Sequence, residues 1–241
     1  MKRDFALIAS ALALIAASAG THKVVRNTPT LDFTFEWPSE AVAIPALDQR
    51  LYNEAKRALA EAQKNAAEDQ KLAREQKRIF NQHDFSMTWT TAGQSPRLLS
   101  LTSQLGSFEG GAHPNSNYGS LLWDRKLNRE IGIDALFSNA GGLAGATRAQ
   151  YCKALDVERS KRRGGQKLDG PFSDCPKYSE LALAPVDKNR NGRFERIAFV
   201  ASPYVAGPYV EGEYEISLPV TGRLIAALKP EYSASFEAQR Q

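Results

Sequence analysis

Residues 97–124 read RLLSLTSQLGSFEGGAHPNSNYGSLLWD, and this stretch decides how the middle of the chain is expected to fold. Residues 97–110 and 118–124 have the composition of β-strands, and the glycine-rich loop between them holds one of the chain's three histidines. The alternating segment FSMTWTT at residues 85–91 comes just before, and a Gly/Pro turn separates it from residues 97–110. We therefore predict a hairpin of residues 85–91 and 97–110, followed by a third strand.

The loop GGAHPN invites a catalytic interpretation of His113. A catalytic histidine needs an orienting acid and a nucleophile or substrate within hydrogen-bond reach. Glu109 and Asp124 are near in sequence, but no serine or cysteine stands in a nucleophile-elbow pattern. Pro114 also disfavours helical backbone at His113. We expect His113 to shape the loop or to contact a ligand, and we predict no catalytic residue.

The part of the chain before this hairpin is predicted to contain one strand and one long helix. LDFTFEW at residues 31–37 alternates apolar and polar positions, which indicates a half-buried strand. Residues 47–80 lack glycine and proline and carry an apolar stripe at helical spacing. The charges on this helix favour a solvated face over a nucleic-acid surface. An oligomerisation role is the alternative, but the stripe is too broken for a long coiled coil.

Strands and helices also follow in runs after residue 130, which favours an α+β fold. The expected architecture has antiparallel sheets, one long N-terminal helix and C-terminal helices packed on the sheet. Asp134 is predicted to cap a short helix, and residues 20–30 to form a polar lead-in. The remaining expected elements are a helix at 141–155, a charged loop or frayed helix end at 158–170, a hairpin of 180–186 with 193–201, a strand at 214–220 and a helix at 221–232.

The first residues predict export. Lys2 and Arg3 precede a short apolar run, and Ala17-Ser18-Ala19 supplies the small residues of a cleavage site. We predict a signal peptide at residues 1–19, a periplasmic or extracellular protein, and contact with a membrane only if the segment is not cleaved. In such a compartment the two cysteines, Cys152 and Cys175, are expected to form a disulfide. The net charge of +4 is too small to indicate a nucleic-acid partner.

Three further motifs leave alternatives open. The residues of DKNRNG at 187–192 resemble the first half of a calcium loop, but the twelfth position is Ala198, which favours a hairpin turn. The basic cluster Arg159, Lys161, Arg162 and Arg163 belongs either to an exposed insertion or to a surface for an anionic polymer. Tyr204, Tyr209 and Tyr214 stand beside glycine and proline, as contact or core residues. We predict no metal site and no cofactor.

The segments EGGAHPNSNYGSLLWD, IGIDALFS and SPYVAGPYVEGEYEISLPV together resemble an RsiV-like domain family of exported bacterial proteins. Members join a domain of the type at the N-terminus of the peptidoglycan deacetylase PdaC to the C-terminal domain of a lysozyme-sensing anti-sigma factor. By this resemblance, residues 20–105 form the first subdomain and residues 106–241 the RsiV-like domain.

The resemblance implies a non-catalytic binding module of the cell envelope, whose partner is a lysozyme-type protein or peptidoglycan. The loops at 108–118 and 203–213 are its expected surface, with His113, Asn115, Tyr204 and Tyr209 as ligand-binding residues. The alternative is an envelope hydrolase that acts on peptidoglycan through an unrecognised site.

Overall fold

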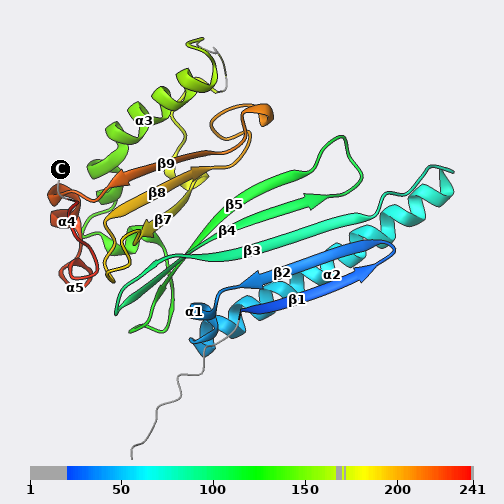
Figure 1. The fold of residues 1–241 in the computed structure, drawn as a ribbon, viewed down its shortest axis with the longest axis horizontal. Helices are drawn as coiled ribbons and strands as arrows, with labels where there is room; N and C mark the ends of the chain where they lie inside the picture. Colours follow the sequence, from blue (N-terminus) through cyan, green and yellow to red (C-terminus); the bar gives the residue numbers. More distant parts are fainter. Residues whose placement is uncertain (1–20, 167–169, 171, 240–241) are drawn as a thin grey trace, which may run out of the picture.

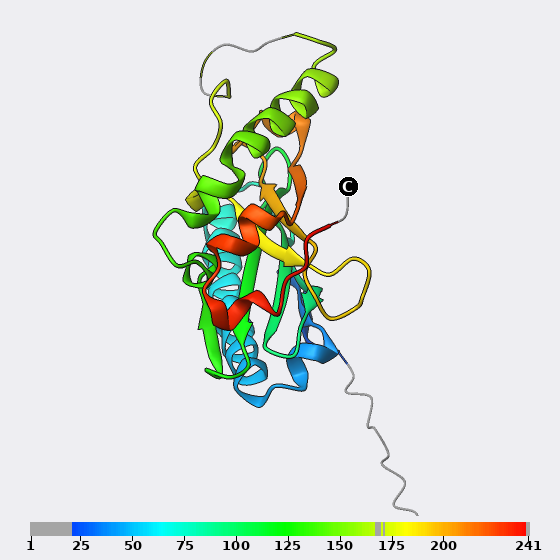
Figure 2. The same ribbon diagram turned by 90° about the vertical axis from the view of Figure 1, so that its left-hand side faces the viewer.

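The computed structural model describes residues 21–166, 170 and 172–239, and the predicted signal peptide lies outside them. Two sheets and the helices on their outer faces build the molecule (Figures 1 and 2). In chain order the elements are β1 (His22–Thr28), β2 (Leu31–Trp37), α1 (Ser39–Val42), α2 (Pro45–Glu75), β3 (His83–Gln94), β4 (Leu98–Phe108), β5 (Asn115–Asp124), β6 (Arg129–Ile131), η1 (Ile133–Leu136), α3 (Gly142–Arg162), η2 (Tyr178–Glu180), β7 (Ala182–Val186), β8 (Arg196–Ala201), η3 (Tyr209–Glu211), β9 (Tyr214–Pro219), α4 (Gly222–Ala227) and α5 (Pro230–Ser233).

The first six strands form one sheet in sequence order, and the last three form a second sheet. In the large sheet every neighbouring pair is antiparallel except β2 and β3, which run parallel. Helix α2 connects these two strands and covers one face of the sheet (Figure 1). The alternating residues Leu31, Phe33, Phe35 and Trp37 of β2 are buried in the same core as Leu47, Leu51 and Ala55 of α2.

The central strands of the large sheet are buried on both faces. Leu99 and Trp123 belong to the core under α2, whereas their neighbours Leu98 and Leu122 belong to a second core with β8, β9 and α3. Because side chains alternate between faces, the two cores lie on opposite sides of the sheet. The molecule is therefore layered as helix, large sheet, small sheet and helices.

A buried carboxylate joins the large sheet to the C-terminal helices. Asp124 is fully buried and accepts hydrogen bonds from the Arg97 guanidinium at 3.0–3.1 Å and from the Tyr232 hydroxyl at 3.1 Å. It also accepts from the backbone N–H groups of Lys126 and Leu127. The Arg97 guanidinium stacks over the Tyr232 ring, 4.2 Å from its centroid. These contacts fix α5 against the sheet.

The predicted α+β class is confirmed, as are the hairpins β3–β4 and β7–β8. The Cys152–Cys175 disulfide is also present and ties α3 to the segment before η2. Among the described residues, no helix is long and apolar enough to cross a membrane.

Several predicted elements were wrong in detail. The lead-in at 20–30 contains strand β1, an edge strand whose mostly exposed residues give no burial pattern. Asp134 lies inside η1, and Gly132 takes the cap position because the turn starts directly after β6. The single helix expected at 221–232 is two, because Pro230 holds Lys229 in extended backbone. The long helix α2 ends at Glu75 rather than near residue 80.

The charged segment at 158–170 was expected to be a loop or a frayed helix end. Helix α3 continues to Arg162, so this segment begins as the end of a helix. The expected subdomain division after residue 105 lies inside β4, which runs from Leu98 to Phe108.

Candidate binding surface

Three exposed or half-buried aromatic side chains from two distant loops form a continuous surface, here called the aromatic shelf: His113, Tyr204 and Tyr209. The His113 ring stacks on Tyr209 with centroids 4.0 Å apart and planes 22° from parallel. Tyr209 in turn stacks on Tyr204 at 5.8 Å and 30°. His113 is exposed and Tyr204 retains 56% of its accessible surface. The shelf is thus rigidly stacked yet open to solvent.

Hydrogen bonds hold the two loops together. The Tyr209 hydroxyl donates to the Pro114 carbonyl at 2.7 Å. Ser202 donates to the Asn117 side chain at 2.6 Å and accepts from the backbone N–H of Tyr118 at 3.0 Å. The start of β5 is therefore fixed to the loop after β8.

The structure brings three of the four predicted ligand-binding residues into contact. Asn115 lies apart from the stack as the first residue of β5, exposed and opposite Ser107 across the hairpin. Nδ1 of His113 lies 2.9 Å from the Pro114 carbonyl oxygen, a contact within the loop itself. Asp124, considered as an orienting acid, is buried at the far end of β5 and bonded to Arg97.

The backbone of the second loop depends on one glycine. A Cβ at Gly207 would overlap the Glu211 carboxylate and lie 2.9 Å from the Tyr214 ring. Tyr204 has a positive φ of 70°, which few side chains adopt, and its N–H donates to the Gly207 carbonyl at 3.0 Å. The close approach at Gly207 and the tight turn at Tyr204 together present the Tyr204 ring to solvent.

Arginines at the C-terminal end of α3 hold this loop in place through hydrogen bonds. The Arg163 guanidinium donates two hydrogen bonds of 2.9 Å to the Glu211 carboxylate, and both side chains are largely buried. The bond from Arg163 lowers the pKa of the Glu211 carboxyl, against the opposing effect of burial. Arg162 donates to the carbonyls of Glu211 and Glu213 at 2.6 Å, and Arg159 donates to the Ala206 carbonyl at 2.9 Å.

The predicted basic cluster is thus mostly structural. Arg159 and Arg163 point into the protein, where Glu211 and the Ala206 carbonyl accept from them, and the more exposed Arg162 donates to loop carbonyls at the surface. Only Lys161 keeps most of its side chain, 79%, exposed. The alternative of an anionic-polymer surface at this cluster is therefore not favoured.

The DKNRNG segment is a turn closed by its own aspartate. Asp187 accepts from the backbone N–H groups of Asn191 at 3.1 Å and Gly192 at 2.9 Å. The side-chain amides of Asn189 and Asn191 donate to Glu237. In the part of the chain that the structure describes, no group of three or more His, Cys, Asp or Glu residues is placed to hold a metal ion.

Comparison with known proteins supports the fold. Residues 24–116 match the family model described as deacetylase PdaC. A solved DUF3298 family protein from Pseudomonas aeruginosa PAO1 is 18% identical, with a TM-score of 0.53 over 91% of this chain and 97% of its own. A DUF3298 family member from Bacteroides fragilis NCTC 9343 is 13% identical, with a TM-score of 0.54 over 90% of this chain and 98% of its own. No curated protein matches the sequence.

The family match and the structural matches cover different parts of this chain. The family match ends just after the GGAHPN loop, so it includes His113 and Asn115 but neither Tyr204 nor Tyr209. The two solved structures align with both sheets of the molecule, since they cover at least 90% of the chain. At identities below 20%, this alignment shows a shared fold.

Proposed function

We propose that this chain is an exported, non-catalytic binding module of the bacterial cell envelope, and that it contacts its ligand through the aromatic shelf. The observation that carries the proposal is the open stack of His113, Tyr209 and Tyr204 on two loops that are bonded to each other. The sequence resemblance as a whole names the two ligands to test, a lysozyme-type protein and peptidoglycan.

The shelf has the physical properties of a contact surface. The edges and outer faces of the stacked tyrosine and histidine rings offer apolar area beside polar groups, which suits both sugar rings and protein side chains. Val210, the next residue after Tyr209 in the chain, has 89% of its surface exposed and adds exposed apolar area to this loop. Because Arg163 and Gly207 already fix the loop, little conformational entropy is lost when a ligand binds.

The surroundings of His113 support binding rather than catalysis. Its ring contacts another ring and a carbonyl oxygen, so a carboxylate does not orient it within the described residues. A general base needs such orientation and a nearby proton donor to act on. The disulfide between Cys152 and Cys175 supports an oxidising compartment, as the predicted signal peptide does.

Two binding measurements test the proposal. The exported chain is titrated with lysozyme by calorimetry and, separately, sedimented with purified peptidoglycan sacculi. We expect saturable binding to one of them and a loss of at least about tenfold in affinity for Tyr209→Ala, as for a central aromatic contact. Tyr204→Ala should weaken binding less, because Tyr204 lies at the edge of the stack.

Tyr52→Ala is the matched control. Tyr52 lies on α2 and is 45% exposed, so this change removes a comparable ring without touching the shelf. The proposal fails if neither ligand binds saturably, or if Tyr209→Ala and Tyr52→Ala bind alike. Turnover of peptidoglycan that His113→Ala abolishes would instead establish the hydrolase alternative.

A further inference from the structure

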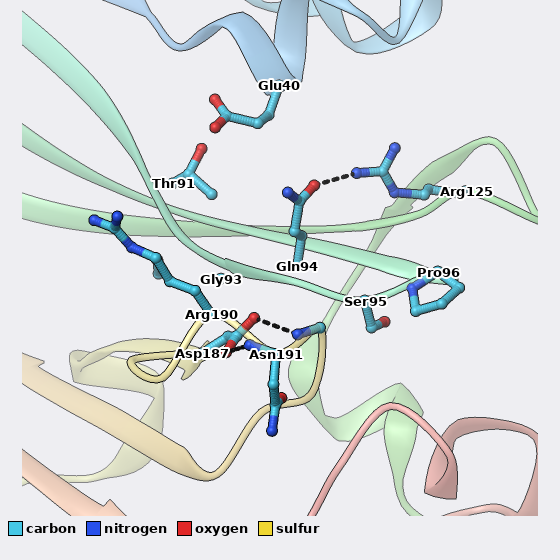
Figure 3. Close-up of a pocket in the computed structure, with 12 residues that line it drawn as sticks. Glu40, Thr91, Gly93, Gln94, Ser95, Pro96, Arg125, Asp187, Arg190 and Asn191 are labelled. Carbon is cyan, nitrogen blue, oxygen red and sulfur yellow. Dashed lines mark hydrogen bonds between the residues drawn. The ribbon is translucent and has the colours of Figure 1, made fainter.

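A second site lies at the opposite end of β4 from the shelf, in a pocket of about 870 Å³ (Figure 3). The pocket lies beyond Thr88, the last residue of β3 that pairs with β2. Residues 89–94 of β3 therefore have no described strand on that side. Helix α1 and the loop between β7 and β8 form the other walls. Gly93 allows this loop close to β3, since a Cβ there would collide with the Asp187 backbone.

Arg125 in the wall of this pocket is poorly paired for a partly buried arginine. Its guanidinium donates to the neutral Gln94 side chain at 3.0 Å. Its Nε atom is buried and has no hydrogen-bond partner among the described residues. Burial lowers the pKa of Arg125, and the negative charge of Glu40 only partly offsets this effect. Within the described chain, the Arg125 cation therefore has no acceptor of opposite charge in direct contact.

Two other arginines of the same chain each donate two hydrogen bonds to a carboxylate. Arg163 holds Glu211 through Nε and a terminal nitrogen, both at 2.9 Å. Arg97 holds Asp124 through the same two positions at 3.1 and 3.0 Å. Arg125 differs because an uncharged amide, Gln94, stands where these arginines have a carboxylate. A carboxylate from outside the chain would supply what is missing.

The other charges of the pocket define the rest of the ligand. The Asp187 carboxylate is already hydrogen-bonded, because its two oxygens accept from backbone N–H groups of its own turn. Glu40 makes only a 3.2 Å bond with the neighbouring Ser39 hydroxyl and forms no ion pair within the described chain. Arg190 on the opposite loop is exposed (Figure 3). Two cations and one acid thus face the same space.

We propose that this pocket binds a short peptide with free charged groups: Arg125 takes its carboxylate and Glu40 its ammonium group. Arg190 adds a second cation for a further carboxylate. Inorganic phosphate or a purely anionic ligand fits less well, because Glu40 repels it. The site is independent of the aromatic shelf, since about ten residues of β4 at about 3.3 Å each separate them.

Calorimetry with the peptidoglycan stem tripeptide L-Ala-γ-D-Glu-meso-diaminopimelate tests the proposal. This peptide carries both free carboxylates and free amino groups. Arg125→Gln should weaken binding at least about tenfold, the usual effect of losing a charged hydrogen bond. The tripeptide with amidated carboxylates should lose a similar factor on the wild-type chain.

Gln94→Glu is the sharper variant. It places a carboxylate at the position that already accepts from Arg125, so it should block the peptide while the melting temperature stays level or rises. Arg129→Gln on β6 removes the same charge outside the pocket and should bind like wild type. The proposal is overturned if Arg125→Gln and Gln94→Glu bind as wild type does, or if the amidated peptide binds equally well. Equal competition by inorganic phosphate would overturn the assignment to a peptide.

Discussion

Replacing Asp124 by asparagine should be among the most destabilising single changes in the chain. The carboxylate is fully buried and accepts from Arg97, Tyr232 and two backbone N–H groups. An asparagine oxygen can keep the backbone bonds, but its amide then faces the Arg97 donors. Arg97 has 18% of its side chain exposed, so it is left as a largely buried, unpaired cation. We expect a loss of about 3 kcal/mol in the free energy of unfolding at pH 7.

The cost of this substitution should depend on pH. The Leu127 N–H, Arg97 and Tyr232 together lower the pKa of Asp124, although burial alone would raise it. A group with a lowered folded pKa stabilises the protein above its unfolded pKa of about 4, and the contribution disappears as pH falls through the folded value. The gap between wild type and Asp124→Asn should therefore narrow steadily below about pH 4.

Urea unfolding followed by circular dichroism, at pH 7 and at about pH 3, measures both effects. Urea is preferable to guanidinium because it does not screen the ion pair. The double variant Arg97→Met with Asp124→Asn should cost less than Asp124→Asn alone, since the asparagine oxygen still accepts from the backbone N–H groups and no cation is left buried. A cost below 1 kcal/mol at pH 7, or an equal cost at both pH values, would refute the role given to this carboxylate.

Three further variants probe other parts of the packing. Tyr151 is fully buried, its hydroxyl has no partner among the described residues, and burial raises its pKa to about 12; Tyr151→Phe should therefore leave the melting temperature level or raise it. A loss above 1 kcal/mol would reveal an unseen partner. Replacing Cys152 and Cys175 by serine opens a loop of 23 residues and should cost about 3 kcal/mol by urea unfolding. Gly207→Ala should lower the melting temperature and weaken shelf binding together, because Glu211 and Tyr214 occupy the space of the new methyl group. A change in only one of these two measurements would separate the loop from the shelf.

The elements that could be predicted from the sequence are those whose buried residues follow a local periodic pattern of apolar and polar positions. The strict alternation of LDFTFEW reappears as alternating buried and half-buried residues in β2. Strand β1 has no such pattern because it lies at the edge of the sheet, where polar residues are tolerated on both faces. The parallel pairing of β2 with β3 was missed for a different reason. It depends on where the chain returns after the 31 residues of α2, and periodicity carries no information about that.

The candidate shelf could be predicted only in part. The sequence singled out both loops through separate motifs, but nothing local shows that His113 stacks on a tyrosine 96 positions later. That contact exists because the β4–β5 hairpin lies against the second sheet, and because Ser202 reaches Asn117 and Tyr118. Asn115 shares the motif with His113, yet strand pairing with Ser107 keeps it out of the stack.

The arginines show why a charge pattern alone is a poor guide to a site. The cluster at residues 159–163 is conspicuous in the sequence, but its three arginines donate to carbonyls and to Glu211 of the same chain. Arg125 and Arg190 lie 65 positions apart in the sequence and come to the same pocket beside β3 only in the folded chain. What distinguishes the two groups is whether the guanidinium has an acceptor of opposite charge. Arg163 has one in Glu211, whereas Arg125 has an amide, and a ligand carboxylate can improve only the second kind of pairing.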